Sequence, residues 1–154
     1  MVHSSGSPIC HLYVTVGTSD SFIVHFHSGT KLEKPVLFVS DQITMLLSPN
    51  NQFNATEFHL TTKELDRWID YAIITPSMPD TMYYFVVGDL NSPASYSTVR
   101  SIRSFPPTPE TLKFISGGGW GLTPAASELA LMAATENPHF IIIGGDLACD
   151  HGMK

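Results

Sequence analysis

Three prolines within four positions, Pro106, Pro107 and Pro109, interrupt this chain about two thirds of the way along its length. Proline fixes its own φ and donates no backbone hydrogen bond, so a β-sheet cannot continue through such a run. Residues 106–110 are therefore predicted to form a stiff linker. Because the hydrophobic pattern differs on its two sides, we expect one structural unit at residues 1–105 and another at residues 111–154.

Before the linker, apolar residues recur with the period of short β-strands. Residues 12–16 and 22–26 alternate in this way on either side of the turn residues 17–20, which predicts a hairpin. The remaining strands are expected at Pro35–Val39, Ile43–Leu47, Trp68–Ile74, Met82–Val87 and Ser97–Ser104. Regular short strands separated by turn residues predict an all-β sandwich.

After the linker, the pattern changes to strand, helix, strand. Strands are expected at Leu112–Ser116 and His139–Ile143, with the glycine-rich loop Gly117–Gly121 and a helix at Ala125–Thr135 between them. Residues 123–124, a Thr-Pro pair, suit the N-cap and first position of that helix. The segment is thus predicted to be one right-handed βαβ unit. Since two strands and one helix leave apolar faces uncovered, we expect it to be the incomplete opening of a larger α/β domain.

The second of these strands ends at a carboxylate. The apolar run His139–Ile143 is typical of a strand buried on both faces, and Gly144 and Gly145 follow it directly before Asp146. In open α/β sheets the ligand crevice lies at the carboxyl ends of the strands. Asp146 is therefore a candidate metal ligand, acid or base, although a turn Asp with a structural role is a common alternative.

Charge and composition limit the partners. Eight Lys and Arg against 14 Asp and Glu give a formal net charge of −6, so neither nucleic acid nor an anionic membrane is expected as the main partner. Residues 1–8 lack the charged and apolar regions of a signal peptide, and no apolar run approaches transmembrane length. Cys10 and Cys149 lie in different predicted units, so free thiols are expected.

Three further features allow both a functional and a structural interpretation. His25 and His27 share one side of a strand, which suits a metal, but alternation with apolar neighbours favours a solvent-facing pair. The glycine-rich loop has Leu122 where a dinucleotide fingerprint needs glycine, which disfavours a nucleotide site. Cys149 could bind zinc, although a buried inert thiol is the commoner use of such a residue.

Residues 79–89 read Pro-Asp-Thr-Met-Tyr-Tyr-Phe-Val-Val-Gly-Asp. This run is similar to the late-strand signature Pro-Gly-Thr-x-Tyr-Tyr-Tyr-x-Val-Gly-Asp, and the whole chain resembles the amino-terminal half of a purple acid phosphatase-like metallophosphoesterase. The resemblance implies a fibronectin type III-like sandwich at residues 1–105 and the start of the metallophosphoesterase domain at residues 111–154. In such sandwiches, a Tyr near Tyr83 commonly forms a tyrosine corner, with its hydroxyl bonded to nearby backbone.

The resemblance also aligns two metal-binding motifs. Gly145–Cys149 matches Gly-Asp-x-x-Tyr, so Asp146 falls at the carboxylate that bridges two metals and Cys149 at the ligating Tyr. Gly118–Gly121 matches Gly-Asp-x-Gly, which puts Gly119 where a metal-binding Asp belongs. The later His-containing motifs are not found in these 154 residues. The family implies a dinuclear metal, iron with iron, zinc or manganese, but Asp146 is its only matching ligand and binding by these residues alone is not expected.

By resemblance, the expected function is hydrolysis of phosphoric monoesters by a metal-bound hydroxide, in a secreted or secretory-pathway protein whose substrate is a phosphate ester. No catalytic residue is assigned, and these residues are expected to be inactive by themselves. The alternative is a non-catalytic binding module, with a protein partner at the sandwich loops, or a truncated product.

Overall fold

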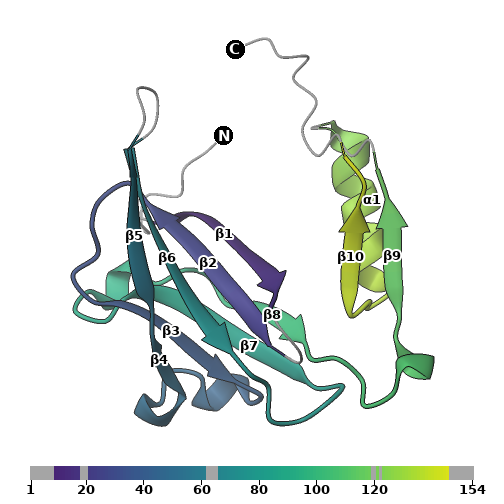
Figure 1. Cartoon of the computed structure of the whole chain (residues 1–154), viewed down its shortest axis with the longest axis horizontal. Coiled ribbons are helices and arrows are strands. Elements are labelled where there is room, and N and C mark those ends of the chain that lie inside the picture. The colour runs from purple at the N-terminus through teal and green to yellow at the C-terminus, as the bar shows by residue number, and fades with distance from the viewer. Residues whose placement is uncertain (1–8, 18–20, 62–65, 119–120, 122, 146–154) are drawn as a thin grey trace. The chain divides into compact units, whose positions relative to one another are not determined.

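The computed structural model describes residues 9–17, 21–61, 66–118, 121 and 123–145. The chain divides into two compact units, Met1–Ser104 and Phe105–Lys154 (Figure 1). Among the described residues, the first unit contains two four-stranded antiparallel sheets, and the second contains one parallel strand pair and one α-helix. The fold is therefore mostly β, with a sandwich as its larger part.

The first sheet has the strand order β1-β2-β6-β5. Its members are β1 (Ile9–Val16), β2 (Phe22–Ser28), β5 (Thr56–Thr61) and β6 (Asp66–Ile74). The predicted hairpin is confirmed, because β1 and β2 pair antiparallel with Val14 opposite Val24. Strand β2 alternates strictly, with Phe22, Val24 and Phe26 buried and the residues between them half-buried. One face of this sheet therefore supplies half of the sandwich core.

The second sheet has the order β4-β3-β7-β8 (Figure 1). Its members are β3 (Pro35–Ser40), β4 (Gln52–Asn54), β7 (Met82–Asp89) and β8 (Arg100–Arg103). Central strands β3 and β7 are buried on both faces. Val36, Phe38 and Val86 form a cluster that Leu46 and partly buried Tyr96 cover. The alternate residues of β3 and β7 face the other side of the sheet and complete the core there. Leu37 and Val87 are two of them, and neither has any exposed surface.

The strand expected at Ile43–Leu47 is wrong, since this segment forms a 3-10 turn, η1 (Ile43–Met45). Met45 N donates to Gln42 O at 3.0 Å, and Gln42 N donates to Ser40 Oγ at 3.1 Å. Of the apolar side chains in the run, Leu46 is buried and its neighbours are largely exposed. Local hydrogen bonds and the burial of Leu46 thus stabilise a turn here in place of a strand.

The sequence did not predict two of the strands, and it predicted one strand that is too long. Strands β4 and β5 were not expected, although Phe58 and Leu60 alternate with polar residues in a way that signals β5. The strand expected at Ser97–Ser104 is reduced to β8, because pairing with β7 extends only from Arg100 to Arg103.

In the second unit, β9 (Phe114–Gly117) and β10 (Phe140–Ile143) pair in parallel, and α1 (Pro124–Thr135) connects them (Figure 1). The predicted strand-helix-strand order is confirmed. Thr123 caps the helix as expected, since its Oγ1 accepts a hydrogen bond from Ala126 N at 3.3 Å. A 3-10 turn, η4 (Pro109–Thr111), begins at the last proline of the predicted linker and precedes β9.

Strand β10 is not buried on both faces, contrary to the sequence prediction. Ile141, Ile142 and Ile143 are 40%, 47% and 38% exposed. A pocket of about 420 Å³ also lies between β9 and α1, with Ile115 and Met132 in its lining. The β-branched run is typical of a covered parallel strand, but among the described residues of the second unit only α1 packs on this pair.

Candidate functional site

The predicted metal site lies where the parallel strands β9 and β10 end. Their register places Ile143 beside Gly117, and Gly144 N extends the pairing by donating to Gly117 O at 2.8 Å. The glycine-rich loop after β9 and the Gly-Gly pair after β10 therefore leave the sheet at the same edge. This is the arrangement in which α/β sheets bind ligands.

Two glycines at this edge are required by geometry. A Cβ at Gly118 would lie 2.7 Å from the carbonyl oxygen of Gly144, a distance that real Cβ atoms do not adopt. Gly145 has a φ of +78°, in the left-handed region that disfavours other residues. The residue directly before Asp146 is thus held in a backbone conformation that glycine adopts readily.

The three positions that align with the family's metal ligands, Asp146, Cys149 and Gly119, lie outside the described residues. Across the ranges that are described, no group of three His, Cys, Asp or Glu side chains could hold a metal ion. The described residues at the edge are glycines and offer backbone groups only. They do not provide the ligand set of a dinuclear metal, so no catalytic step is derived through one.

His25 and His27 lie on the outer face of the first sheet, opposite the core residues of β2, as the alternation indicated. Both side chains are half-buried and make ring or polar contacts with their neighbours. His25 Nε2 lies 3.0 Å from Thr15 Oγ1, and its ring stacks on Tyr13 at 4.8 Å between centroids. The ring of His27 packs edge-on against His11 at 5.5 Å. Desolvation lowers the pKa of both histidines, which favours neutral imidazoles.

The cysteine that the structure describes, Cys10, is a free and exposed thiol whose Sγ lies 3.4 Å from the carbonyl oxygen of His27. This agrees with the expectation of a free thiol at this position. Cys149 lies outside the described residues, so both its zinc-ligand and inert-thiol interpretations stay open.

The signature run at residues 79–89 has a structural role. Tyr83 Oη accepts a hydrogen bond from Met78 N at 3.0 Å, which is the backbone contact expected of a tyrosine corner. Asp89 is buried and accepts from Glu33 N at 2.6 Å and from Asn91 N at 2.9 Å. A Cβ at Gly88 would lie 2.7 Å from Tyr96 Cδ1. The run thus fastens both ends of β7 to neighbouring loops.

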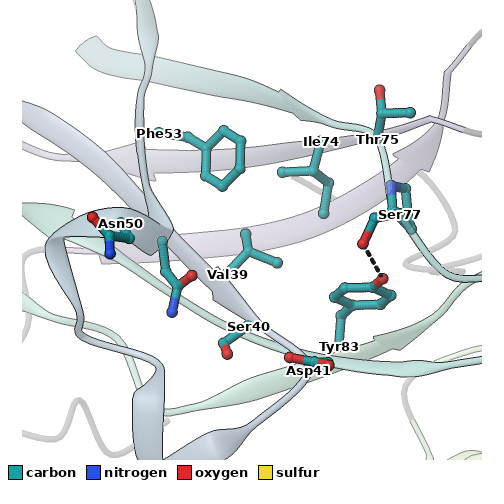
Figure 2. Close-up of a pocket in the computed structure, with 11 residues that line it drawn as sticks. Val39, Ser40, Asp41, Asn50, Phe53, Ile74, Thr75, Ser77 and Tyr83 are labelled. Atoms are coloured by element: carbon teal, nitrogen blue, oxygen red, sulfur yellow. Dashed lines mark hydrogen bonds between the residues drawn. The ribbon is translucent and has the colours of Figure 1, made fainter.

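A pocket of about 290 Å³ opens at one end of the sandwich, beside the tyrosine corner (Figure 2). It lies where β3, β4, β6 and β7 approach one another and contains both apolar and polar side chains. Its lining includes Val39, Asp41, Asn50, Phe53, Ile74 and Tyr83. Sequence analysis missed this pocket because its residues come from four separate stretches of the chain, and the one motif among them, the run around Tyr83, indicates a tyrosine corner and not a cavity.

A buried carboxyl group is the second feature that sequence analysis missed. Asp70 on β6 faces the core opposite Phe26, has no exposed surface, and neither of its oxygens has a hydrogen-bond partner among the described residues. Burial, reinforced by the nearby charges of Glu57 and Asp89 and opposed by Lys31, raises the pKa of Asp70 to about 7. The signal was hidden because both alternating sets of β6 are largely apolar.

Comparison with known proteins gives a likeness of fold. No family model matches the sequence, and no curated protein matches it. The solved structure of purple acid phosphatase PPD1 from seeds of yellow lupin (Lupinus luteus) matches with a TM-score of 0.69 at 14% identity. The match covers 96% of this chain and 31% of the lupin chain.

A second match is the solved structure of Astrotactin-2, a vertebrate-specific, perforin-like membrane protein. It has a TM-score of 0.43 at 13% identity, and covers 83% of this chain and 28% of the Astrotactin-2 chain. This likeness is too distant to inform the fold. Among the described residues, no helix is long and apolar enough to cross a membrane. This chain, which spans about a third of the lupin protein, is therefore similar in fold to part of a purple acid phosphatase.

Proposed function

We propose that these 154 residues form the amino-terminal sandwich and the opening βαβ unit of a purple acid phosphatase-like hydrolase of phosphoric monoesters. The observation that carries this proposal is the likeness to the lupin enzyme over 96% of the chain. So extensive a match requires that the second unit take part as well as the sandwich. The tyrosine corner at Tyr83 and the signature run around it support the same assignment.

In this proposal, the second unit is the start of a catalytic domain. Its exposed isoleucines on β10 and its pocket beside α1 are what a parallel sheet shows before further strands and helices are added. The sandwich, which has a complete core, is the non-catalytic part. Fibronectin type III-like remains our proposed assignment for it.

Asp146 is the residue that we propose for the metal site. It follows the left-handed Gly145 at the carboxyl edge of the parallel pair, where the family places its bridging carboxylate. The family's metal pair, iron with iron, zinc or manganese, would polarise the phosphate ester and supply hydroxide. One carboxylate cannot hold two ions, so the other ligands would come from groups beyond these residues. A phosphate ester substrate and the secretory pathway belong to the same proposal.

Metal binding tests the motif alignment. The test uses a double variant, Gly119→Asp with Cys149→Tyr, which puts the family's metal-binding Asp and Tyr back at the two positions where this sequence departs from the motifs. We expect this double variant to bind Zn²⁺ or Fe³⁺ about tenfold more tightly than the original chain by equilibrium dialysis and elemental analysis, because three ligands replace one. The triple variant that adds Asp146→Asn is the matched control and should lose the gain.

Equal metal binding by all three chains would contradict the alignment of Asp146. Two equivalents of metal on the original chain, with hydrolysis of p-nitrophenyl phosphate, would show that the site uses groups other than those named here.

A non-catalytic binding module is the second candidate function. The sandwich pocket beside Tyr83 favours it, because a preformed cavity with convergent polar groups is the usual form of a small-molecule site.

A further inference from the structure

We propose that the pocket at the end of the sandwich binds a neutral sugar ring. The pocket lies wholly within the first unit and uses none of the residues aligned with the metal motifs. The inference therefore goes beyond phosphate ester hydrolysis and would stand if that proposal failed.

The size and floor of the pocket suit one ring-shaped molecule. Its volume of about 290 Å³ lies just below the roughly 300 to 1,000 Å³ of drug-sized ligand pockets, which suits a small ligand. Val39 and Ile74 form apolar walls, and the ring of Phe53 is 40% exposed beside them. Figure 2 shows the three side chains around the centre of the pocket. An exposed aromatic face in such a place can pack against the C–H face of a sugar ring.

The polar groups lie at the sides of this apolar centre. Asn50 lies on one side, and Asp41 lies with Tyr83 on the other (Figure 2). Neither Asp41 nor Asn50 makes a side-chain hydrogen bond or ion pair within the described parts of the chain, so a carboxylate and an amide are available to a ligand. Together they offer donors and acceptors to hydroxyl groups, which both give and accept hydrogen bonds.

The charge of the lining selects against phosphorylated ligands. No Lys or Arg is among the eleven residues that line the pocket, and Asp41 is the one charged residue. A phosphate group would meet a carboxylate without a compensating cation, whereas a neutral hydroxyl can donate to it. A neutral polyol ring is thus the ligand class that matches shape, polarity and charge together.

Several lining groups are already held in place. Asn51 Nδ2 donates to Met45 O at 2.7 Å, and Tyr83 Oη lies 3.4 Å from Ser77 Oγ while it accepts from Met78 N. These contacts fix the turn η2 (Pro49–Asn51) and the loop after β6 around the cavity. A site with fixed walls loses less conformational freedom on binding.

Saturation-transfer NMR on the 154-residue chain tests the proposal, with D-glucose, D-mannose, D-galactose and N-acetylglucosamine as probes at about 20 mM, a range that detects millimolar affinity. We expect at least one of them to bind saturably. Phe53→Ala should weaken it about tenfold through loss of the ring contact, and Asn50→Ala should weaken it by a similar factor through loss of the amide. Two independent variants keep the test valid if one of them does not fold.

Tyr13→Ala is the matched control, because Tyr13 is an exposed aromatic residue on the outer face of the first sheet and lies outside the pocket. It should leave binding unchanged. Glucose 6-phosphate should bind more weakly than glucose, and Asp41→Asn should narrow that difference. No saturable binding of any probe, binding that neither pocket variant weakens, or a preference for the phosphorylated sugar would each overturn the proposal.

Discussion

The two units of this chain use apolar residues with different results. In the sandwich, Phe26 and Leu37 have no exposed surface, because two sheets cover each other. In the second unit, the buried apolar residues among those described are Ala126 and Ala133, whereas Leu131 is 70% exposed. An apolar sequence therefore forms a core only where a second apolar face packs against it. The sandwich has that second face within its own residues, and the described part of the βαβ unit does not.

The largest effect should come from truncating the sandwich core. Phe26→Ala should lower the free energy of unfolding of the first unit by about 3 to 5 kcal/mol, through lost burial and the cavity that remains. Leu131→Ala on α1 is the matched apolar truncation in the second unit and should cost less than about 0.5 kcal/mol, since its side chain is mainly in water. Urea unfolding followed by circular dichroism measures both free energies, and equal losses would contradict the difference in burial between the two units.

The next effect concerns the buried carboxyl of Asp70. Its pKa of about 7 in the folded chain lies above the ordinary value of 3.8, so the folded state holds a proton that the unfolded state releases between these values. Stability from this group is therefore fully present below about pH 4 and falls as the pH rises to 7, by roughly 4 kcal/mol in all. Asp70→Asn should remove this decline, with stabilisation at pH 8 and little change near pH 4.

Exposed Asp41 provides the control for that measurement. Asp41→Asn makes the same chemical change at an exposed carboxylate and is the matched control. A decline of stability between pH 4 and 7 that persists in Asp70→Asn would show that another group is responsible.

Hydrogen exchange of the native chain should separate the units on a smaller scale. We expect the amides of β9 and β10 to exchange on the order of 100-fold faster than those of β3 and β7, because the described residues of the second unit bury little apolar surface. Limited proteolysis should likewise cut within residues 105–145 first. Protection of β10 equal to that of β7 would mean that the second unit has a stabilising contact not seen here.

The smallest effect is local to α1. Thr123→Ala should destabilise the second unit by about 1 kcal/mol, because Ala126 N loses the side-chain oxygen that caps it. Thr123→Ser retains the hydroxyl and should restore most of that loss. The helical signal in circular dichroism, and exchange of the amides in the first turn, would record the change. An unchanged first turn in Thr123→Ala would show that the cap does not contribute.

Sequence patterns predicted elements where one local signal dominated. The Thr-Pro start of α1 and the alternation along β2 each specify the element by themselves, and both were predicted correctly. Ile43–Leu47 was mispredicted because composition alone does not separate a strand from a turn anchored by Leu46. The isoleucines of β10 were expected to be buried from their β-branching, but burial depends on residues that lie elsewhere in space.

The candidate sites divide in the same way. The sequence could indicate the glycine-lined end of the β9–β10 pair because each motif there is contiguous in the chain. Gly118 and Gly145 indeed have backbone geometry that only glycine adopts readily. The sandwich pocket could not be predicted, since Asp41, Asn50 and Phe53 acquire meaning only through the pairing of β3 and β4. Non-local assembly of ordinary residues leaves no pattern along the chain.

The buried Asp70 also makes folding of the sandwich a reaction with a proton as a reactant. Between about pH 4 and 7, each chain that folds takes up hydrogen ion from its buffer, and each that unfolds returns it. The apparent heat of unfolding in this range should then include the ionisation enthalpy of the buffer. Calorimetric scans in phosphate and in imidazole at one pH should therefore give different apparent enthalpies of unfolding. The size of this difference gives the number of protons that unfolding releases, and so reports the protonation of a carboxyl that the solvent does not reach.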